Sequence, residues 1–266
     1  MRLCRYLYSN APRVGRLEGD VILPCHLDDI VAVMRGADLA PDGAPVSLGD
    51  VRLLAPVRPG KLLGAAKNYA DHAAELDEPL SAEPSIFSKL VSSVTAPSGP
   101  VIRPAYTREL DYEGELAVVI GRRVRGVTPL EAMDAVFGYT IINDVTARDL
   151  QRTEPQWTRA KGGDTFAPIG PWIVTADEIA DPQSLSVRTW VNDELRQDGH
   201  TSQMITPVAQ LVSWCSHSFT LEPGDVLATG TPAGVGIGLD PPRYLEPGDR
   251  VRIEIEGIGS IAHEIV

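Results

Sequence analysis

The sequence predicts an α+β protein in which β-strands predominate, with a small β-rich unit at residues 1–55 and a larger unit at residues 56–266. The boundary rests on the proline-rich stretch Leu54-Ala-Pro-Val-Arg-Pro-Gly-Lys61, because proline blocks helix formation and stiffens a connection. Short apolar runs bounded by Gly, Pro and Asp outnumber the helix-like segments, which indicates the predominance of strands. With 266 residues, 43% of them hydrophobic, the chain can bury a substantial core.

In the first unit, hairpin-like runs such as Arg16–Pro24 precede one predicted helix at residues 27–35. In the second unit, residues 61–66 are predicted as a buried strand and the alanine-rich residues 69–75 as a helix. Apolar runs predict further strands at residues 116–120, 137–143, 172–175, 187–191, 226–229 and 251–255. Further helices are predicted at residues 130–136, 145–152 and 207–216.

The sequence Leu-Glu-Pro-Gly-Asp occurs twice, at residues 221–225 and 245–249, each time directly before a predicted strand. Proline followed by glycine suits the two central positions of a type II turn, where the second residue has a positive φ. Two copies are too few for a repeat array, so we expect two similar turns.

Charge and cysteine content exclude several classes of protein. The formal net charge is −12 and no basic run is present, so a nucleic-acid partner is not expected. Cys4, Cys25 and Cys215 are odd in number and lack metal-binding spacing, which predicts reduced thiols. The N-terminal stretch has charge where a signal peptide needs apolar residues, and no apolar run reaches membrane-spanning length. We therefore expect a cytoplasmic protein with no membrane partner.

Two carboxylates stand at the start of a predicted strand, in the stretch Asp111-Tyr-Glu-Gly-Glu115. Side chains two residues apart on a strand share a face, which holds Glu113 and Glu115 roughly 6 to 7 Å apart. They are either exposed carboxylates or two ligands of a divalent cation, which would offset their repulsion. A metal site needs a third oxygen ligand.

Asp144 can supply that ligand, because it follows directly after the predicted strand that ends at Asn143. It can also be the N-cap of a helix that begins at Val145, and one carboxylate can do both. Three carboxylates without a His or Cys cluster favour Mg²⁺ or Mn²⁺ over zinc. In that helix Arg148 and Gln151 lie on the same face as Asp144. This face is either exposed to solvent or directed toward a ligand, whose carboxylate the Arg148 guanidinium could bind.

Two further segments carry chemically capable side chains. His72 and Glu75 are three residues apart in the predicted helix, so they form either an exposed polar face or a pair that can activate water. Lys161 precedes two glycines, which indicates either close backbone approach to a ligand or a flexible surface loop. No nucleophile motif is present that would support a covalent hydrolase mechanism.

The glycine-rich run Thr229–Gly238 follows a predicted strand, but it does not match a nucleotide-binding loop. It lacks the Gly-Lys-Ser/Thr ending of a P-loop, and its glycine spacing differs from the dinucleotide-binding pattern. We instead expect a loop that lies close to a small ligand, with the Thr231 hydroxyl and backbone N–H groups as hydrogen-bond donors.

Taken together, these motifs resemble the fumarylacetoacetate hydrolase family, in order from about residue 56 to the C-terminus. The matching segments are residues 67–75, 87–89 with 92–93, 111–115, 138–151, 161–171 and 229–236. The resemblance implies a C-terminal domain of mixed β-sandwich or β-roll type, a bound Mg²⁺ or Mn²⁺, and a homodimer. Relatives often have a bulkier residue in place of Gly162 or Gly163, so we expect a roomier pocket beside Lys161.

The resemblance also implies a role for each candidate residue. Glu113, Glu115 and Asp144 match the metal ligands. The remaining positions match a water-activating pair on a lid (His72, Glu75), a lysine that polarises the substrate or handles a proton (Lys161), and substrate-side residues (Arg148, Gln151, Thr231, Lys89).

The expected substrate is a small 2-oxo acid, because its carboxylate and 2-oxo oxygens can chelate one metal ion that stabilises an enolate. The presence of His72 and Glu75 favours hydrolysis of a carbon–carbon bond in a 2,4-dioxo acid such as an acylpyruvate or fumarylpyruvate, with release of pyruvate. Two alternatives use the same enolate: decarboxylation of an oxaloacetate-like acid, and isomerisation or decarboxylation of 2-hydroxyhepta-2,4-dienedioate. A non-catalytic binding protein is the alternative of another class.

Overall fold

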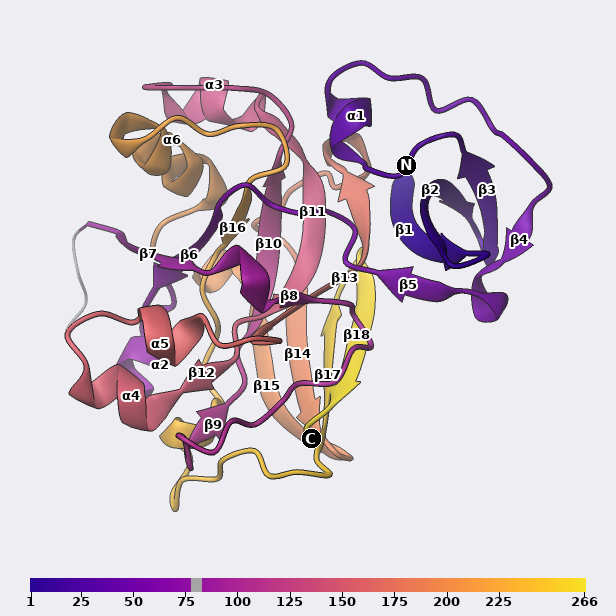
Figure 1. Ribbon diagram of the computed structural model, residues 1–266. Coiled ribbons are helices and arrows are strands. Elements are labelled where there is room, and N and C mark those ends of the chain that lie inside the picture. The colour runs from indigo at the N-terminus through magenta and orange to yellow at the C-terminus, as the bar shows by residue number, and fades with distance from the viewer. Residues whose placement is uncertain (78–82) are drawn as a thin grey trace.

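The computed structural model describes residues 1–77 and 83–266. Its strands form a twelve-stranded sheet and a four-stranded sheet that pack face to face, together with one short two-stranded pair, and its helices lie around them (Figure 1). This arrangement confirms the predicted fold class, an α+β protein that is mostly β.

The N-terminal residues form a meander of strands that continues the large sheet. The elements are β1 (Arg2–Tyr8), β2 (Ala11–Glu18), β3 (Val21–Cys25), α1 (Val31–Met34), β4 (Val46–Ser47) and β5 (Arg52–Leu54). The predicted hairpins are present, because β1, β2 and β3 pair antiparallel in chain order. The helix predicted at residues 27–35 is shorter than expected, and its start is fixed by Asp29, whose carboxylate accepts the N–H of Val31.

The larger unit contains the remaining strands and helices. Its strands are β6 (Leu62–Ala66), β7 (Ser85–Lys89), β8 (Val94–Thr95), β9 (Leu110–Asp111), β10 (Gly114–Ile120), β11 (Val136–Asn143), β12 (Thr146–Ala147), β13 (Ala167–Thr175), β14 (Ser186–Val191), β15 (Glu194–His200), β16 (Val226–Ala228), β17 (Arg250–Ile255) and β18 (Gly259–Glu264). Its helices are α2 (Ala70–Glu75), α3 (Pro129–Met133), α4 (Arg148–Thr153), α5 (Thr158–Lys161) and α6 (Val208–Ser218).

The large sheet runs in the order β4-β3-β2-β1-β13-β11-β10-β16-β6-β7, and β5 and β8 pair with β1 and β13. The pairing of β1 with β13 joins the N-terminal strands to the rest of the sheet. The small sheet, β15-β14-β17-β18, packs on one face of β10, β11 and β13. Figure 1 shows α2, α4 and α5 grouped on the side away from the N-terminal strands.

Strand β10 is buried on both faces, which explains its continuous apolar sequence. Leu116 and Val118 belong to the core between the two sheets, whereas Ala117 and Val119 belong to a second core on the opposite face. This alternation follows from the two-residue period of a strand. Glu115 shares the parity of Ala117, so its side chain is directed to the face opposite the small sheet.

Two helices predicted in the larger unit differ from the structure. In the predicted helix at residues 145–152, residues 146–147 instead form β12, which pairs with β9, and α4 begins only at Arg148. The argument that placed Asp144, Arg148 and Gln151 on one helical face is therefore wrong, and Asp144 is not a helix N-cap. The helix predicted at residues 130–136 ends at Met133, because Val136 already pairs in β11.

Other predictions are confirmed. Gly224 and Gly248 have φ values of 91° and 96°, and in each Leu-Glu-Pro-Gly-Asp copy the Asp N–H donates to the Glu carbonyl, as a type II turn requires. Cys4, Cys25 and Cys215 are free and buried. Among residues 1–77 and 83–266, no helix is long and apolar enough to cross a membrane.

The two turns provide a matched test of what stabilises the fold. Asp225 is buried, accepts the N–H groups of Lys61 and Glu222, and forms an ion pair with the Lys61 ammonium at 2.6 Å. Asp225→Ala leaves those groups without an acceptor, so we expect a loss of about 3 kcal/mol in the free energy of unfolding. Asp249 is the equivalent, more exposed residue, and Asp249→Ala should cost only about 1 kcal/mol. Urea denaturation measures both; equal losses would contradict this assignment.

Candidate active site

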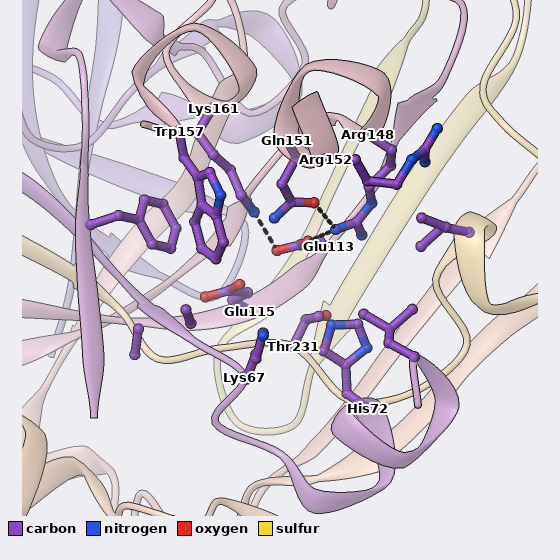
Figure 2. Close-up of a pocket in the computed structure, with 15 residues that line it drawn as sticks. Lys67, His72, Glu113, Glu115, Arg148, Gln151, Arg152, Trp157, Lys161 and Thr231 are labelled. Carbon is purple, nitrogen blue, oxygen red and sulfur yellow. Dashed lines mark hydrogen bonds and ion pairs between the residues drawn. The ribbon is translucent and has the colours of Figure 1, made fainter. Parts of the chain in front are cut away.

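A cavity of about 550 Å³ lies where β10 begins and β11 ends. Side chains from α2, β7, β10, α4, α5 and the loop after β16 line it (Figure 2). In Figure 2, Lys161 and Gln151 lie on one side of Glu113, and His72 and Thr231 lie on the other. Segments distant in the sequence therefore meet around one carboxylate.

Antiparallel pairing brings the three predicted metal ligands together. Gly114 of β10 pairs with Asn143 of β11, and the N–H of Asp144 donates to the carbonyl of Glu113 at 2.9 Å. Glu113 and Glu115 thus lie beside Asp144, where β10 begins and β11 ends. Each residue offers a carboxylate oxygen, and these oxygens all lie within 4.8 Å of one another. All three side chains are buried.

Two buried lysines compensate part of the negative charge of these carboxylates. Lys161 Nζ lies 2.8 Å from both Glu113 and Asp144, and Lys89 Nζ forms an ion pair with the other oxygen of Asp144. Burial works to lower the pKa of Lys161, but Asp144 and Glu113 outweigh burial and raise it. For Lys89 burial prevails over Asp144 and lowers the pKa. Lys89 does not line the cavity, so its contact is with Asp144 rather than with a substrate.

Glu113 and Glu115 have opposite electrostatic environments. Burial works to raise the pKa of Glu113, but Lys161 and Arg148 hold it below its usual range. Burial, Asp144 and Glu113 together raise the pKa of Glu115 well above its usual value. The hydrogen bond that Glu115 receives is from the N–H of Gly230 at 2.7 Å. A cation between the three carboxylates would relieve this repulsion, so the donor set fits a divalent metal ion.

Arg148 connects the carboxylates to the cavity. Its Nε donates to Asp111 at 2.8 Å, and its Nη1 lies 2.7 Å from Glu113 and 2.9 Å from the amide oxygen of Gln151. Its Nη2 is buried and has no hydrogen-bond partner within residues 1–77 and 83–266. Because Arg148 lines the cavity, this donor can bind a ligand carboxylate. Asp111 is the first residue of the Asp111–Glu115 motif, in which only Glu113 and Glu115 were predicted to be site residues.

His72 and Glu75 form the predicted pair at the cavity wall. His72 Nδ1 lies 3.1 Å from Glu75 Oε2, and His72 is only 4% exposed. An ionised carboxylate can only accept, so this contact places a proton on Nδ1, and in the neutral imidazole Nε2 then has a lone pair. His72 lines the cavity together with Glu113 and Glu115, so its free nitrogen can serve as a base there.

Thr231 also lines the cavity, but its hydroxyl proton is already used. Gln197 accepts the N–H of Gly114 and donates to the carbonyl of Pro232, which fixes its amide orientation, and its Nε2 also donates to Thr231 Oγ1 at 2.7 Å. The Thr231 hydroxyl therefore donates to the Gly114 carbonyl at 3.0 Å. Our expectation that this hydroxyl donates to a ligand is wrong, because only a lone pair is left to accept a hydrogen bond.

The glycine-rich loop binds carboxylates of the protein itself. Besides Gly230, which donates to Glu115, Gly236 and Ile237 donate backbone N–H groups to Asp111. Gly234 donates to Glu75. The loop thus orients several acidic side chains around the cavity.

Several cavity residues were not identified from the sequence. Phe87 and Trp157 form an edge-to-face pair with ring centroids 5.5 Å apart, and Lys67 and Arg152 also line the wall. They come from four separate segments, so no spacing within one segment indicates that they meet. Lys67 and Phe87 do lie inside motifs that we recognised, whereas nothing in the sequence marks Trp157 or Arg152.

Gly162 and Gly163 do not enlarge the cavity, contrary to our expectation. Neither lines it. A Cβ on Gly162 would lie 2.5 Å from the Thr158 carbonyl oxygen and 3.0 Å from Leu90, and a Cβ on Gly163 would lie 3.0 Å from Phe166 and Tyr106. The space that larger side chains would need is therefore already filled.

Comparison with known proteins identifies the family. The model "Fumarylacetoacetate (FAA) hydrolase C-terminal" matches residues 61–266, and "Rv2993c-like, N-terminal" matches residues 1–56. The mitochondrial oxaloacetate tautomerase fahd2 of Xenopus laevis is 40% identical over 100% of this chain and 90% of its own length.

Two solved structures extend the comparison. The fumarylacetoacetate hydrolase of Exiguobacterium antarcticum has 43% identity and a TM-score of 0.91, over 100% of this chain and 99% of that chain. The maleylpyruvate hydrolase of Sphingobium sp. SYK-6, in complex with manganese(II) and pyruvate, has 33% identity and a TM-score of 0.80 over the same shares. The chain is a member of the fumarylacetoacetate hydrolase family, whose related members named here are enzymes.

Proposed function

We propose that Glu113, Glu115 and Asp144 hold one divalent cation, Mg²⁺ or Mn²⁺, and that the enzyme uses it to form the enolate of a 2-oxo acid. Three oxygen donors with no thiolate or imidazole among them suit these hard cations. The manganese complex of the related maleylpyruvate hydrolase supports a metal of this kind. When bound, the cation would polarise the 2-oxo group and stabilise negative charge on its oxygen.

The formal charges of the site favour an anionic substrate. Asp111, Glu113, Glu115 and Asp144 carry four negative charges, and Lys89, Lys161 and Arg148 carry three positive charges. The sum, −4 + 3 = −1, becomes +1 with a divalent cation. Arg148 Nη2 can then receive a substrate carboxylate. Arg152 also lines the cavity, but its guanidinium is already paired with Glu109 at 2.6 Å, so Arg148 is the cation to which we assign the substrate carboxylate.

The reaction that we favour is keto–enol tautomerisation of a dicarboxylic 2-oxo acid of the oxaloacetate type. The observation that carries it is the free Nε2 of His72 in the same cavity as the carboxylate cluster. His72 would take a proton from C3; the electron pair of that C–H bond would form the C2–C3 double bond, and the π pair of the 2-oxo group would move onto its oxygen as the enolate forms. Protonation of the oxygen gives the enol. We place tautomerisation before hydrolysis because the Xenopus laevis relative, which matches the whole of this chain, is named an oxaloacetate tautomerase.

Hydrolysis of a 2,4-dioxo acid, our expectation from the sequence, remains the second candidate. The His72–Glu75 pair favours it, since the same nitrogen can take a proton from water, whose oxygen then attacks the distal carbonyl. The C3–C4 bond breaks, its electron pair stays on the pyruvate fragment as an enolate, and a carboxylic acid is released. The two hydrolases among the related structures support this reaction.

The homodimer implied by the resemblance stays a prediction. Sedimentation equilibrium would distinguish a monomer of 28.7 kDa from a dimer of twice that mass.

Removal of one metal ligand tests the cation site. Glu115→Gln keeps the size of the side chain but removes its charge, so we expect Mn²⁺ affinity to fall by about 100-fold or more in calorimetric titration. The metal-free variant should unfold at no lower temperature than wild type, because one buried repulsive charge is gone. Glu264→Gln, at an exposed position of β18, is the control and should bind Mn²⁺ normally. Unchanged affinity in Glu115→Gln would rule out this site.

Enolate formation can be followed directly. With Mg²⁺ or Mn²⁺ the enzyme should accelerate conversion between the keto and enol forms of oxaloacetate, read from enol absorbance, and exchange of the C3 hydrogens with deuterated solvent, read by NMR. A chelator should stop both, because the cation stabilises the enolate. Conversion that persists at full rate in the presence of the chelator would contradict the mechanism.

Replacement of His72 separates the two candidate reactions. His72→Gln removes the base, so tautomerisation should fall by about 10² to 10⁴-fold while Mn²⁺ affinity is retained. His26→Gln, whose side chain is 91% exposed, is the control. If His72→Gln keeps tautomerisation but loses cleavage of acylpyruvates, His72 acts on water and hydrolysis is the function.

A further inference from the structure

The glycine-rich loop after β16 contacts the His72–Glu75 pair through the carboxylate of Glu75. Glu75 Oε1 accepts the N–H of Gly234 at 2.8 Å, while Oε2 lies 3.1 Å from His72 Nδ1. Both oxygens of Glu75 therefore have a partner, one on the loop and one on α2. The hydrogen bond to the loop spans 159 residues of sequence.

Gly238 leaves the space that the Glu75 carboxylate occupies. A Cβ built on Gly238 would lie 2.1 Å from Glu75 Cδ and 2.3 Å from its Cγ and Oε1, which is far inside van der Waals contact. The φ of Gly238 is not in the positive region that disfavours other residues, so its backbone does not require glycine. What requires a glycine here is the position of the Glu75 side chain.

Gly234 is fixed for a different reason. Its φ is 101°, and a Cβ there would lie 1.9 Å from the carbonyl oxygen of Arg196. A substitution at Gly234 would move backbone and disturb the fold, whereas the three atoms nearest to a Cβ on Gly238 all belong to the flexible side chain of Glu75. Gly238 is therefore the position at which the contact can be changed by itself.

We propose that Gly238 is a positioning residue for the His72–Glu75 pair: its missing side chain lets the loop hold the Glu75 carboxylate where it orients His72. The inference rests on the proposed role of His72 as a base. With Glu75 fixed at both oxygens, the neutral imidazole of His72, which lines the cavity, keeps its proton on Nδ1 and its lone pair on Nε2. The loop thereby sets the activity of a base on another segment.

The experiment compares Gly238→Ala with Gly49→Ala. A Cβ on Gly49 would have only Ser47 Oγ within 4 Å, at 3.7 Å, so Gly49→Ala is the matched control. Gly238→Ala should lower kcat for oxaloacetate tautomerisation, or for acylpyruvate cleavage if that is the reaction, by about 100-fold, because a displacement of about 1 Å has this effect. KM and Mn²⁺ affinity should stay near those of wild type.

A double-mutant cycle with Glu75→Ala shows whether Gly238 acts through Glu75. Once Glu75 is truncated, Gly238→Ala has nothing to displace and should change kcat no further. An equal loss in the wild-type and Glu75→Ala backgrounds would overturn the proposal, as would a normal kcat in the single Gly238→Ala variant.

A spectroscopic readout separates this inference from the proposed function. NMR of protein with ¹⁵N-labelled histidine identifies which ring nitrogen of His72 carries the proton, with His72→Gln used to assign the signal. Wild type should show the Nδ1–H form, and both Gly238→Ala and Glu75→Ala should lose that preference. If wild type turns over no 2-oxo acid, the proposed function fails but this readout still decides the role of Gly238. An unchanged tautomer in Gly238→Ala would overturn it.

Discussion

The structure depends on how three buried carboxylates coexist within 4.8 Å. Lys161 contacts two of them and Lys89 contacts one, whereas neither lysine forms an ion pair with Glu115, which accepts the N–H of Gly230. Charges buried without compensation destabilise a fold by several kcal/mol, so this cluster needs its lysines even before a cation binds. A bound divalent cation would complete the compensation and would change the formal charge of these seven side chains from −1 to +1. Stability and anion binding therefore follow from the same set of charges.

The need to compensate these buried carboxylates explains why the site contains residues from many segments of the chain. A carboxylate cluster at the end of an antiparallel pair needs cations from outside that pair, and these come from β7, α4 and α5. The glycine-rich loop adds backbone donors, which orient acidic side chains without adding positive charge. His72 lines the same cavity, and its contact with Glu75 through Nδ1 leaves Nε2 for the proposed role as base.

Sequence reasoning located most of this site but misjudged how it is assembled. Glu113 and Glu115 line one cavity as expected, although Glu113 lies just before β10 and not within it, and Asp144 follows the end of β11 as predicted. The prediction that Arg148 shares a helical face with Asp144 was wrong, because residues 146–147 are extended and pair as β12 with β9. Such pairing between distant segments cannot be predicted from the local sequence pattern. Arg148 reaches the site nonetheless, through its bonds to Asp111 and Glu113. The fold class and the turns were predictable, whereas the packing of the small sheet and the aromatic wall at Trp157 were not.

The central claim is that a cation joins the three carboxylates, and anomalous diffraction tests it most directly. Crystals soaked in Mn²⁺ should show one strong anomalous peak at the manganese edge, within coordination distance, about 2.0 to 2.3 Å, of oxygens from Glu113, Glu115 and Asp144. A peak only elsewhere, or none at a Mn²⁺ concentration that saturates activity, would contradict the account.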